Sequence, residues 1–261
     1  MSTRFFHFIS DLLVMVGRNL THYQRIPQLI IFSTIQPVMF ILLFNYVFGG
    51  AIRTGGSSAY INYLLPGILA QTAIFGSMAT GMGLAVDVTK GIVDRFKSLP
   101  MARSAFLLGR TFADMMRNIF VIALMFAVGY LVGFRLQGTF SDLLTSSALL
   151  LLFGFAFSWI SAAIGLWVRS IETAQVAGFI WVFPLVFASS AFVPVQTMPD
   201  WLQHFAKWNP VTLTVNAARA LLLDNASDLA TATYVWQSLC WIAVILAIFI
   251  PLSVYLYRRA A

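Results

Sequence analysis

Six long apolar stretches constrain this chain more than any other feature of its sequence. Each is bounded by charged residues, Pro or Gly, and each is long enough to cross a bilayer, which takes roughly 20 residues of helix. Only 10% of the 261 residues are charged, whereas about 25% are charged in a soluble protein. The sequence therefore predicts an all-α membrane protein with six transmembrane helices in a single domain covering residues 1–261. We place the spans at about 28–49, 62–86, 111–134, 143–168, 173–195 and 233–257.

Lys and Arg are concentrated on alternate connections between these stretches. The N-terminus, the loop 87–110 and the C-terminus carry most of them, and the intervening loops carry few. Because cytoplasmic loops are enriched in Lys and Arg, we expect a multi-pass protein of the bacterial cytoplasmic (inner) membrane with both termini in the cytoplasm. The net charge of +7 then reflects membrane orientation and contact with membrane lipid, and no nucleic-acid partner is expected.

The first 27 residues have the pattern of a helix that lies on a membrane surface. No small-residue cleavage site follows the first span, so this segment is not expected to be a removable signal peptide. At about 100° per residue, apolar and polar side chains separate onto opposite faces. This pattern predicts a helix over residues 1–27 in the cytoplasmic interface. The apolar face holds Phe5, Ile9, Leu12, Leu13, Val16, Leu20 and Tyr23, and the polar face holds Arg4, His7, Asp11, Arg18, His22 and Arg25.

Motifs for catalysis, metal binding and nucleotide binding are missing from the sequence. There is no G-x-x-x-x-G-K-[ST] loop, no H-E-x-x-H and no cysteine cluster, so we expect neither an enzyme nor a chain that binds a cofactor or metal. The middle of each span lacks an ionisable residue, which disfavours an ion-coupled or passive transporter working alone. The charged residues near span ends are expected to form local ion pairs, one among Arg110, Asp114 and Arg117 and one between Arg169 and Glu172.

The loop 87–110 reads DVTKGIVDRFKSLPMARSAFLLGR and combines charge with helix-forming residues. Pro100 should stop a short helix near Leu99. Ile92, Phe96 and Leu99 recur at i, i+4 and i+7, which gives a narrow apolar stripe that needs a partner surface. An anchor on lipid headgroups is the alternative interpretation.

The segment 197–224 is longer than a turn requires and stays apolar. Pro199 and Asp200 suit the first turn of a short helix, and the pair Asn209 and Pro210 should end it. A second half-helix should then return over about 211–224. We predict a re-entrant pair at the outer side, with three aromatic side chains on one face of the first helix at the interface. These are Trp201, Phe205 and Trp208.

Three stretches of this sequence resemble the permease subunit of type-2 ABC exporters, and within them the DrrB-like group associated with daunorubicin resistance. They are RIPQLIIFSTIQPVMFILLFNYVFGGAI (25–52), GIVDRFKSLPMARSAFLLGRTFAD (91–114) and SSAFVPVQTMPDWLQHFAKWNPVT (189–212). The resemblance implies a permease that pairs with a second copy of itself or with a homologous permease. It also implies two copies of a separate ABC ATP-binding subunit, which would hold the ATP and Mg.

The resemblance further implies roles for particular segments. The N-terminal helix would touch the ATP-binding subunit, and 197–224 would cap the exit. The loop would contain a coupling helix that docks on that subunit. Its residues are Gly91, Asp94, Arg95, Phe96, Lys97, Ser98, Leu99 and Pro100.

If two copies line a path with spans one, two and five, its wall is apolar and aromatic with scattered polar groups. Such a wall suits a lipophilic or amphipathic substrate, namely a drug, a lipid or a lipid-like metabolite. Export of a polysaccharide or glycolipid, and a membrane scaffold that transports nothing, remain alternatives. Phenylalanines are also expected in a lipid-facing bundle without any substrate. The candidate path residues are Asn45, Gln71, Thr72, Phe75, Ser77 and Thr80.

Overall fold

The computed structural model describes residues 2–25, 27–49, 60–98, 103–168, 170–223 and 229–259, and in these ranges the regular elements are helices without β-strands. The N-terminal half contains α1 (Ser2–Arg25), α2 (Pro27–Leu43), the π-helical turn η1 (Phe44–Phe48), α3 (Tyr60–Thr89), α4 (Ile92–Lys97) and α5 (Arg103–Val132). The C-terminal half contains α6 (Phe140–Val168), α7 (Ile171–Phe187), the 3-10 turn η2 (Val195–Thr197), α8 (Asp200–Trp208), α9 (Pro210–Leu222) and α10 (Leu229–Arg259).

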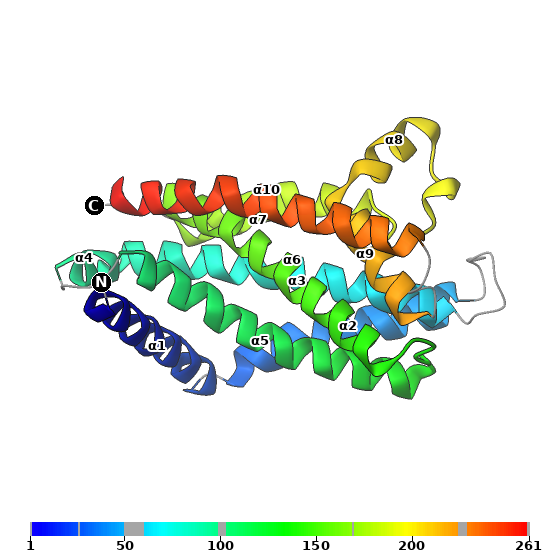
Figure 1. The fold of residues 1–261 in the computed structure, drawn as a ribbon, viewed down its shortest axis with the longest axis horizontal. Helices are drawn as coiled ribbons and strands as arrows, with labels where there is room; N and C mark the ends of the chain where they lie inside the picture. The colour runs from blue at the N-terminus through cyan, green and yellow to red at the C-terminus, as the bar shows by residue number, and fades with distance from the viewer. Residues whose placement is uncertain are drawn as a thin grey trace.

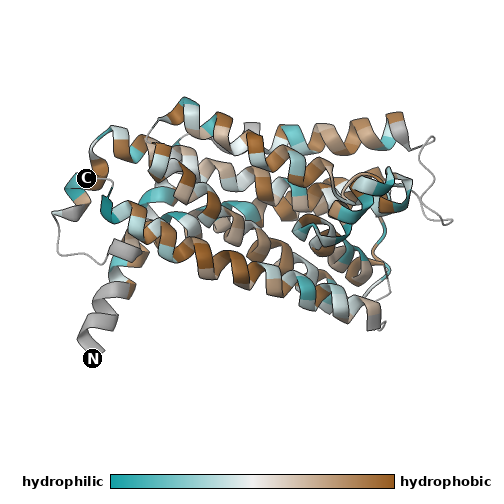
Figure 2. Ribbon diagram, turned by 90° about the horizontal axis from the view of Figure 1, so that it is seen from above, coloured by the Kyte–Doolittle hydropathy of each residue, from teal (hydrophilic) through white to brown (hydrophobic). Residues whose placement is uncertain are grey.

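Four of the described helices, α3, α5, α6 and α10, are long and apolar enough to cross a membrane. Two shorter apolar helices accompany them, over Ser33–Val47 and Ile171–Phe187. Helices α3 and α6 are mostly buried and form the centre of the bundle, whereas only 33% of the apolar window of α5 and 17% of that of α10 are buried. Figure 2 shows hydrophobic residues along the long helices. Exposed apolar surface on this scale requires a lipid environment.

The long helices run side by side, so the molecule has two distinct ends (Figure 1). The beginning of α1, the short helix α4 and the last turns of α10 lie at one end, which we call the termini end. Helix α8 lies at the opposite end, which we call the α8 end. Loop 87–110 and segment 197–224 are therefore separated by the length of the bundle.

Helices α3 and α6 cross closely because glycines meet at the crossing. A Cβ atom on Gly81 would lie 2.4 Å from the carbonyl oxygen of Ser161, and one on Gly165 would lie 2.1 Å from the carbonyl oxygen of Gly81. Small residues allow backbones in a membrane bundle to approach in this way. Gly76 and Gly83 of α3 instead leave room for side chains of α5.

The fifth apolar stretch is helical only as far as Phe187, eight residues short of the expected end at 195. Carbonyl groups freed at this point find other donors, since the side-chain nitrogen of Asn209 lies 2.7 Å from the carbonyl of Leu185 and 2.9 Å from that of Ala188. The irregular backbone after α7 is covered by protein, with Ala191 fully buried and its carbonyl pressed against Gly67 of α3. A helix can break within an apolar stretch when its backbone is buried and hydrogen-bonded in this way.

Candidate functional site

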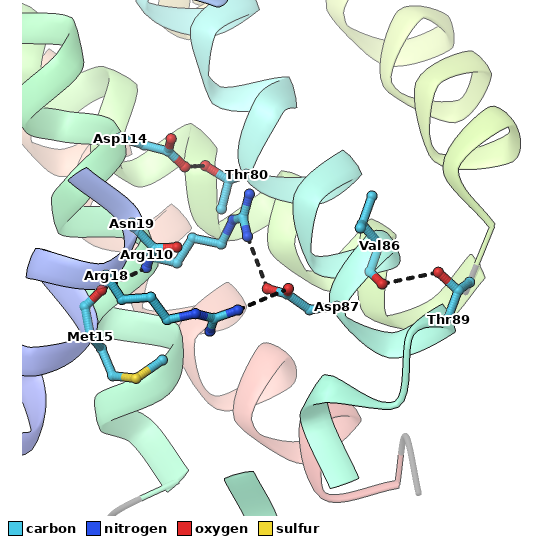
Figure 3. A network of polar contacts seen from close by, with 9 residues as sticks. All are labelled: Met15, Arg18, Asn19, Thr80, Val86, Asp87, Thr89, Arg110 and Asp114. Carbon is cyan, nitrogen blue, oxygen red and sulfur yellow. Dashed lines mark hydrogen bonds and ion pairs between the residues drawn. The ribbon is translucent and has the colours of Figure 1, made fainter. Parts of the chain in front are cut away.

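An ion-pair network joins three helices at the termini end (Figure 3). Asp87, near the end of α3, accepts a hydrogen bond from Arg110 of α5 at 2.9 Å and lies 3.5 Å from a guanidinium nitrogen of Arg18 in α1. The Asp87 side chain is only 8% exposed. A carboxylate buried to this extent is stable when charged partners compensate it. Arg110 thus pairs across helices, and Asp114, its expected local partner, accepts a hydrogen bond from Thr80.

Helix α4 packs against the protein's own core. It starts after Gly91, whose φ of +64° is readily adopted by glycine. Val93 is buried, and the ring of Phe96 lies 5.3 Å from that of Phe106 in α5. The guanidinium of Arg18 lies 5.0 Å from the same Phe96 ring. The chain itself therefore supplies a partner surface for Phe96 of the expected apolar stripe.

The face of α4 that remains accessible is polar. Asp94, Arg95 and Ser98 are exposed, and the Ser98 hydroxyl donates to the carbonyl of Arg95 at 2.8 Å. The helix ends at Lys97, two residues before the expected end. Leu99 and Pro100 lie outside the described residues, as does Arg169 of the expected pair with Glu172. A partner that approaches this helix would meet charge and hydroxyl groups before apolar side chains.

Helix α1 turns part of its polar face toward the protein. Met15 is buried, and a Cβ on Gly109 of α5 would lie 2.4 Å from the Cβ of Met15. Arg18, expected on the polar face of this helix, reaches Asp87. Leu13 and Val14 point outward, with exposed fractions of 64% and 63%. Of the expected apolar face, Ile9 and Leu13 are thus exposed, whereas Leu12, Val16 and Leu20 are half-buried.

A cavity of about 200 Å³ opens halfway along the bundle, between α2, α3, α5 and α7. Three of the expected path residues, Gln71, Thr72 and Phe75, line it. Asn45 lies in η1, outside the lining. Its full lining is Ser33, Gln36, Pro37, Phe40, Gln71, Thr72, Phe75, Gly76, Met78, Ala79, Met82, Arg117, Asn118, Val121, Gln175 and Phe179.

The other two expected path residues, Ser77 and Thr80, form hydrogen bonds to neighbouring helices. The hydroxyl of Ser77 donates to the carbonyl of Ile74 at 2.6 Å and lies 3.3 Å from the hydroxyl of Ser161 in α6. Thr80 donates to Asp114 of α5. Both therefore hold helices together and lie outside the cavity lining.

Sequence reasoning missed Arg117 and Asn118 as cavity residues. Arg117 lies halfway along α5 and is only 8% exposed, and its Nη2 donates to the carbonyl of Gly76 at 2.7 Å. In the span expected from residue 111, Arg117 lies just inside the span end, whereas α5 already begins at Arg103. Gly76, which lies opposite in α3, is the indication in the sequence that a large side chain can enter there.

At the α8 end, two helices meet at Asn209. Pro199 precedes α8 as its N-cap residue, Asp200 begins the helix, and Pro210 begins α9. The side-chain oxygen of Asn209 accepts from the backbone N–H of Val211 at 2.9 Å and so caps α9. Three aromatic side chains of α8 are exposed, Trp201 at 74%, Phe205 at 48% and Trp208 at 74%.

Arg219 of α9 ties the α8 end to α3, a contact that residue spacing along the chain does not predict. Its guanidinium lies 3.6 Å from the centre of the Tyr63 ring. It also donates to the carbonyl of Tyr63 at 3.1 Å and to that of Ser190 at 3.0 Å. The buried segment after α7 is thereby clamped between α3 and α9.

Comparison with known families decides what kind of protein carries these features. Residues 10–223 match the family described as ABC-2 type transporter. The chain belongs to the ABC-2 transporter family. This ABC-2 chain is 33% identical to the daunorubicin resistance ABC transporter permease protein DrrB1 of Streptomyces coeruleorubidus, over 96% of the chain and 87% of the relative.

Two further relatives are similar over most of their length. The putative transport permease ycf38 of Cyanophora paradoxa is 30% identical over 83% of the ABC-2 chain and 75% of its own length. The probable doxorubicin resistance ABC transporter permease protein DrrC of Mycobacterium tuberculosis is 26% identical over 97% of the ABC-2 chain and 90% of its own length. The ABC-2 chain is thus a multi-pass membrane protein whose family implies a separate ATP-binding partner.

Proposed function

We propose that this chain is the membrane-spanning permease subunit of an ATP-driven ABC exporter that moves a lipophilic or amphipathic substrate out across the cytoplasmic membrane. The observation that carries the proposal is the match to a drug-resistance permease over 96% of the chain. The relatives named for daunorubicin and doxorubicin resistance suggest a drug, lipid or lipid-like metabolite as the substrate. The apolar cavity with a few polar groups agrees with that chemistry.

In this proposal a separate ATP-binding subunit holds ATP and Mg and drives the permease. Two such subunits would act on two permease chains, either two copies of this one or this one and a homologue. The accessible face of α4, with Asp94 and Arg95, supports a docking role, because exposed charges on a short helix offer specific contacts to a partner. The Asp87 network would then carry movement of α4 and α1 into α3 and α5.

The proposed topology has six spans, both termini in the cytoplasm, and α8 and α9 as a re-entrant pair on the outer side. Helices α2 and α7 would be the two spans that fall short of full bilayer length by themselves. For α2, the turn η1 extends the helix. For α7, the buried segment that follows the helix continues toward the α8 end. The end-to-end separation of α4 and α8 in Figure 1 supports this arrangement.

The test is purification of the tagged chain from its own host in mild detergent, followed by mass spectrometry of stoichiometric partners and an ATPase assay. We expect an ATP-binding subunit to copurify and the complex to show vanadate-sensitive hydrolysis. Inverted vesicles that contain the complex should take up daunorubicin or a lipophilic dye only when ATP is present. A chain that purifies without any ATPase and supports no uptake would contradict the proposal.

A further inference from the structure

A groove between α2 and α7 runs along α3 and contains the cavity in one part of its length. Both helices pack against α3, whereas the backbones of their described residues scarcely approach each other. Both run from the side of the termini end toward the α8 end (Figure 1). The cavity is lined by residues of α2 up to Phe40 and by residues of α7 up to Phe179. The later residues of each helix therefore lie between the cavity and the α8 end.

Four stacked aromatic rings bridge the groove in this later part, and we call them the ring stack. The ring of Phe44, in the turn η1, has its centre 4.8 Å from that of Phe192, which follows α7. Phe192 lies 5.4 Å from Phe187 at the end of α7, and Phe44 lies 5.7 Å from Phe40. The planes of these three pairs differ by only 20°, 28° and 24°, as in stacked rings. Because Phe40 also lines the cavity, the ring stack begins where the cavity ends.

Two more rings connect the ring stack to α3. Phe183 lies 5.2 Å from Phe187, and its ring meets that of Phe75 in α3 edge to face at 5.7 Å. Phe75 is itself part of the cavity lining. A molecule or ion that moves along the groove from the cavity to the α8 end would therefore have to displace aromatic rings.

The backbone on both sides of the ring stack is irregular and is held by side chains. The hydroxyl of Tyr60 donates to the carbonyl of Phe192 at 3.0 Å, and that of Tyr63 donates to the carbonyl of Ser190 at 3.2 Å. On the other side, Phe44 begins a π-helical turn, a rare conformation that is frequent at functional sites. Phe44 and Phe192 can therefore separate without unwinding of α2 or α7.

We propose that the ring stack closes the groove between the cavity and the α8 end, and that it opens when Phe44 and Phe192 separate. Packed apolar rings exclude water, and with it ions and polar solutes, from a narrow passage. Tyr60 and Tyr63 are positioning residues, because their hydroxyl groups fix the backbone that carries Phe192. The inference rests on the proposed function only in treating the groove as the route of the cargo.

The test measures access to the cavity from each side of the membrane, with the full chain in right-side-out and inverted vesicles. In a Cys240→Ser background, Ala79→Cys places a thiol in the cavity lining. Gln196→Cys, at an exposed position near the α8 end, shows which side that end faces. A membrane-impermeant thiol reagent applied on that side should label Gln196→Cys rapidly and Ala79→Cys much more slowly.

Two variants remove one ring each from the ring stack. Phe192→Ala and Phe44→Ala should each speed labelling of Ala79→Cys from the α8 side by roughly ten-fold, the effect of losing one stacked pair from the closed state. Tyr63→Phe loses only the donor to Ser190 and should give a smaller increase. Phe205→Ala, the matched control, removes an exposed ring of α8 at the same end and should leave the rate unchanged.

Unchanged labelling rates in both Phe192→Ala and Phe44→Ala would overturn the proposal. Labelling of Ala79→Cys as fast as that of Gln196→Cys, with all rings present, would overturn it as well. This second comparison needs no ring variant, so it decides the question even if Phe192→Ala does not fold.

Labelling requires neither ATP nor an ATP-binding subunit, so it separates this inference from the proposed function. Faster labelling in the ring variants, without ATP-driven uptake in vesicles, would keep the closure and contradict the exporter. ATP-driven uptake with unchanged labelling in both ring variants would contradict only the closure.

Discussion

At the residue scale, Asp87 links three helices at the termini end, because it pairs with Arg18 of α1 and Arg110 of α5. It compensates two cations from different helices, and one of them also covers the ring of Phe96 in α4. Arg110 is 16% exposed at its side chain and Arg18 is 37% exposed, so water screens the second pair more than the first. Loss of the carboxylate would leave Arg110 in particular without its counter-charge.

We therefore expect Asp87→Asn to lower the free energy of unfolding by about 1–3 kcal/mol, less than for a fully buried pair because Arg18 is partly solvated. The thermal unfolding midpoint of the purified chain, followed by tryptophan fluorescence, should fall by several degrees. Asp200→Asn, an exposed aspartate at the start of α8, is the matched control and should change the midpoint little. Equal midpoints for the two variants would mean that Asp87 contributes little to stability.

Asn209 permits a sharper experiment, because its side-chain oxygen and its side-chain nitrogen bind different helices. The oxygen caps α9, and the nitrogen satisfies two carbonyls of the broken helix α7. Asn209→Ser keeps an oxygen for the cap and loses both donors, whereas Asn209→Ala loses all three contacts. We expect stability to fall in the order wild type, Ser, Ala, with each step costing roughly 1–2 kcal/mol.

Amide hydrogen exchange distinguishes the two losses at Asn209. Both variants should speed exchange after α7, and only Asn209→Ala should also speed it in the first turn of α9. If both variants exchanged at the wild-type rate after α7 and in the first turn of α9, the contacts of Asn209 would be redundant.

These residue contacts also mark where sequence reasoning ends. Arg110 stands four residues before Asp114, and this helical spacing favoured a local pair. In the structure Arg110 instead pairs with Asp87 on α3, because the crossing of the two helices brings that carboxylate within 2.9 Å. Spacing along one helix predicts neighbours on that helix, whereas partners on another helix depend on how the two helices cross.

At the element scale, α4 combines one face buried in the bundle with one face open to a partner. Phe96→Ala should destabilise the chain by about 1–2 kcal/mol, less than a fully buried phenylalanine because the ring is only partly buried. Arg95→Ala should leave stability unchanged and reduce ATP-driven uptake into vesicles, as should Asp94→Ala. Thr89→Ala, exposed at the end of α3, is the control for uptake. Full uptake with both charge variants would remove α4 as the docking element.

The elements differ in how well apolarity predicted them. Helix α6 (Phe140–Val168) begins three residues before the expected start at 143 and ends at the expected residue, 168. Its bounds are predictable because a long apolar stretch ends at polar flanks on both sides. Helix α7 ends early although its sequence stays apolar, since α3 and α9 cover the backbone and Asn209 satisfies its carbonyls. The cavity residue Arg117 was missed for a related reason, because hydropathy does not show which side chain enters a gap beside Gly76.

At the scale of the whole molecule, the two polar ends should face different compartments. Ser98 at the termini end and Gln196 near the α8 end are both exposed, and the chain's one cysteine, Cys240, can be replaced by serine. In that background, a membrane-impermeant thiol reagent applied to intact cells should label Gln196→Cys. It should label Ser98→Cys only after the membrane is permeabilised, because positively charged connections stay in the cytoplasm. Labelling of Ser98→Cys in intact cells, with Gln196→Cys protected, would invert the proposed orientation and place α4 where no ATP-binding subunit could reach it.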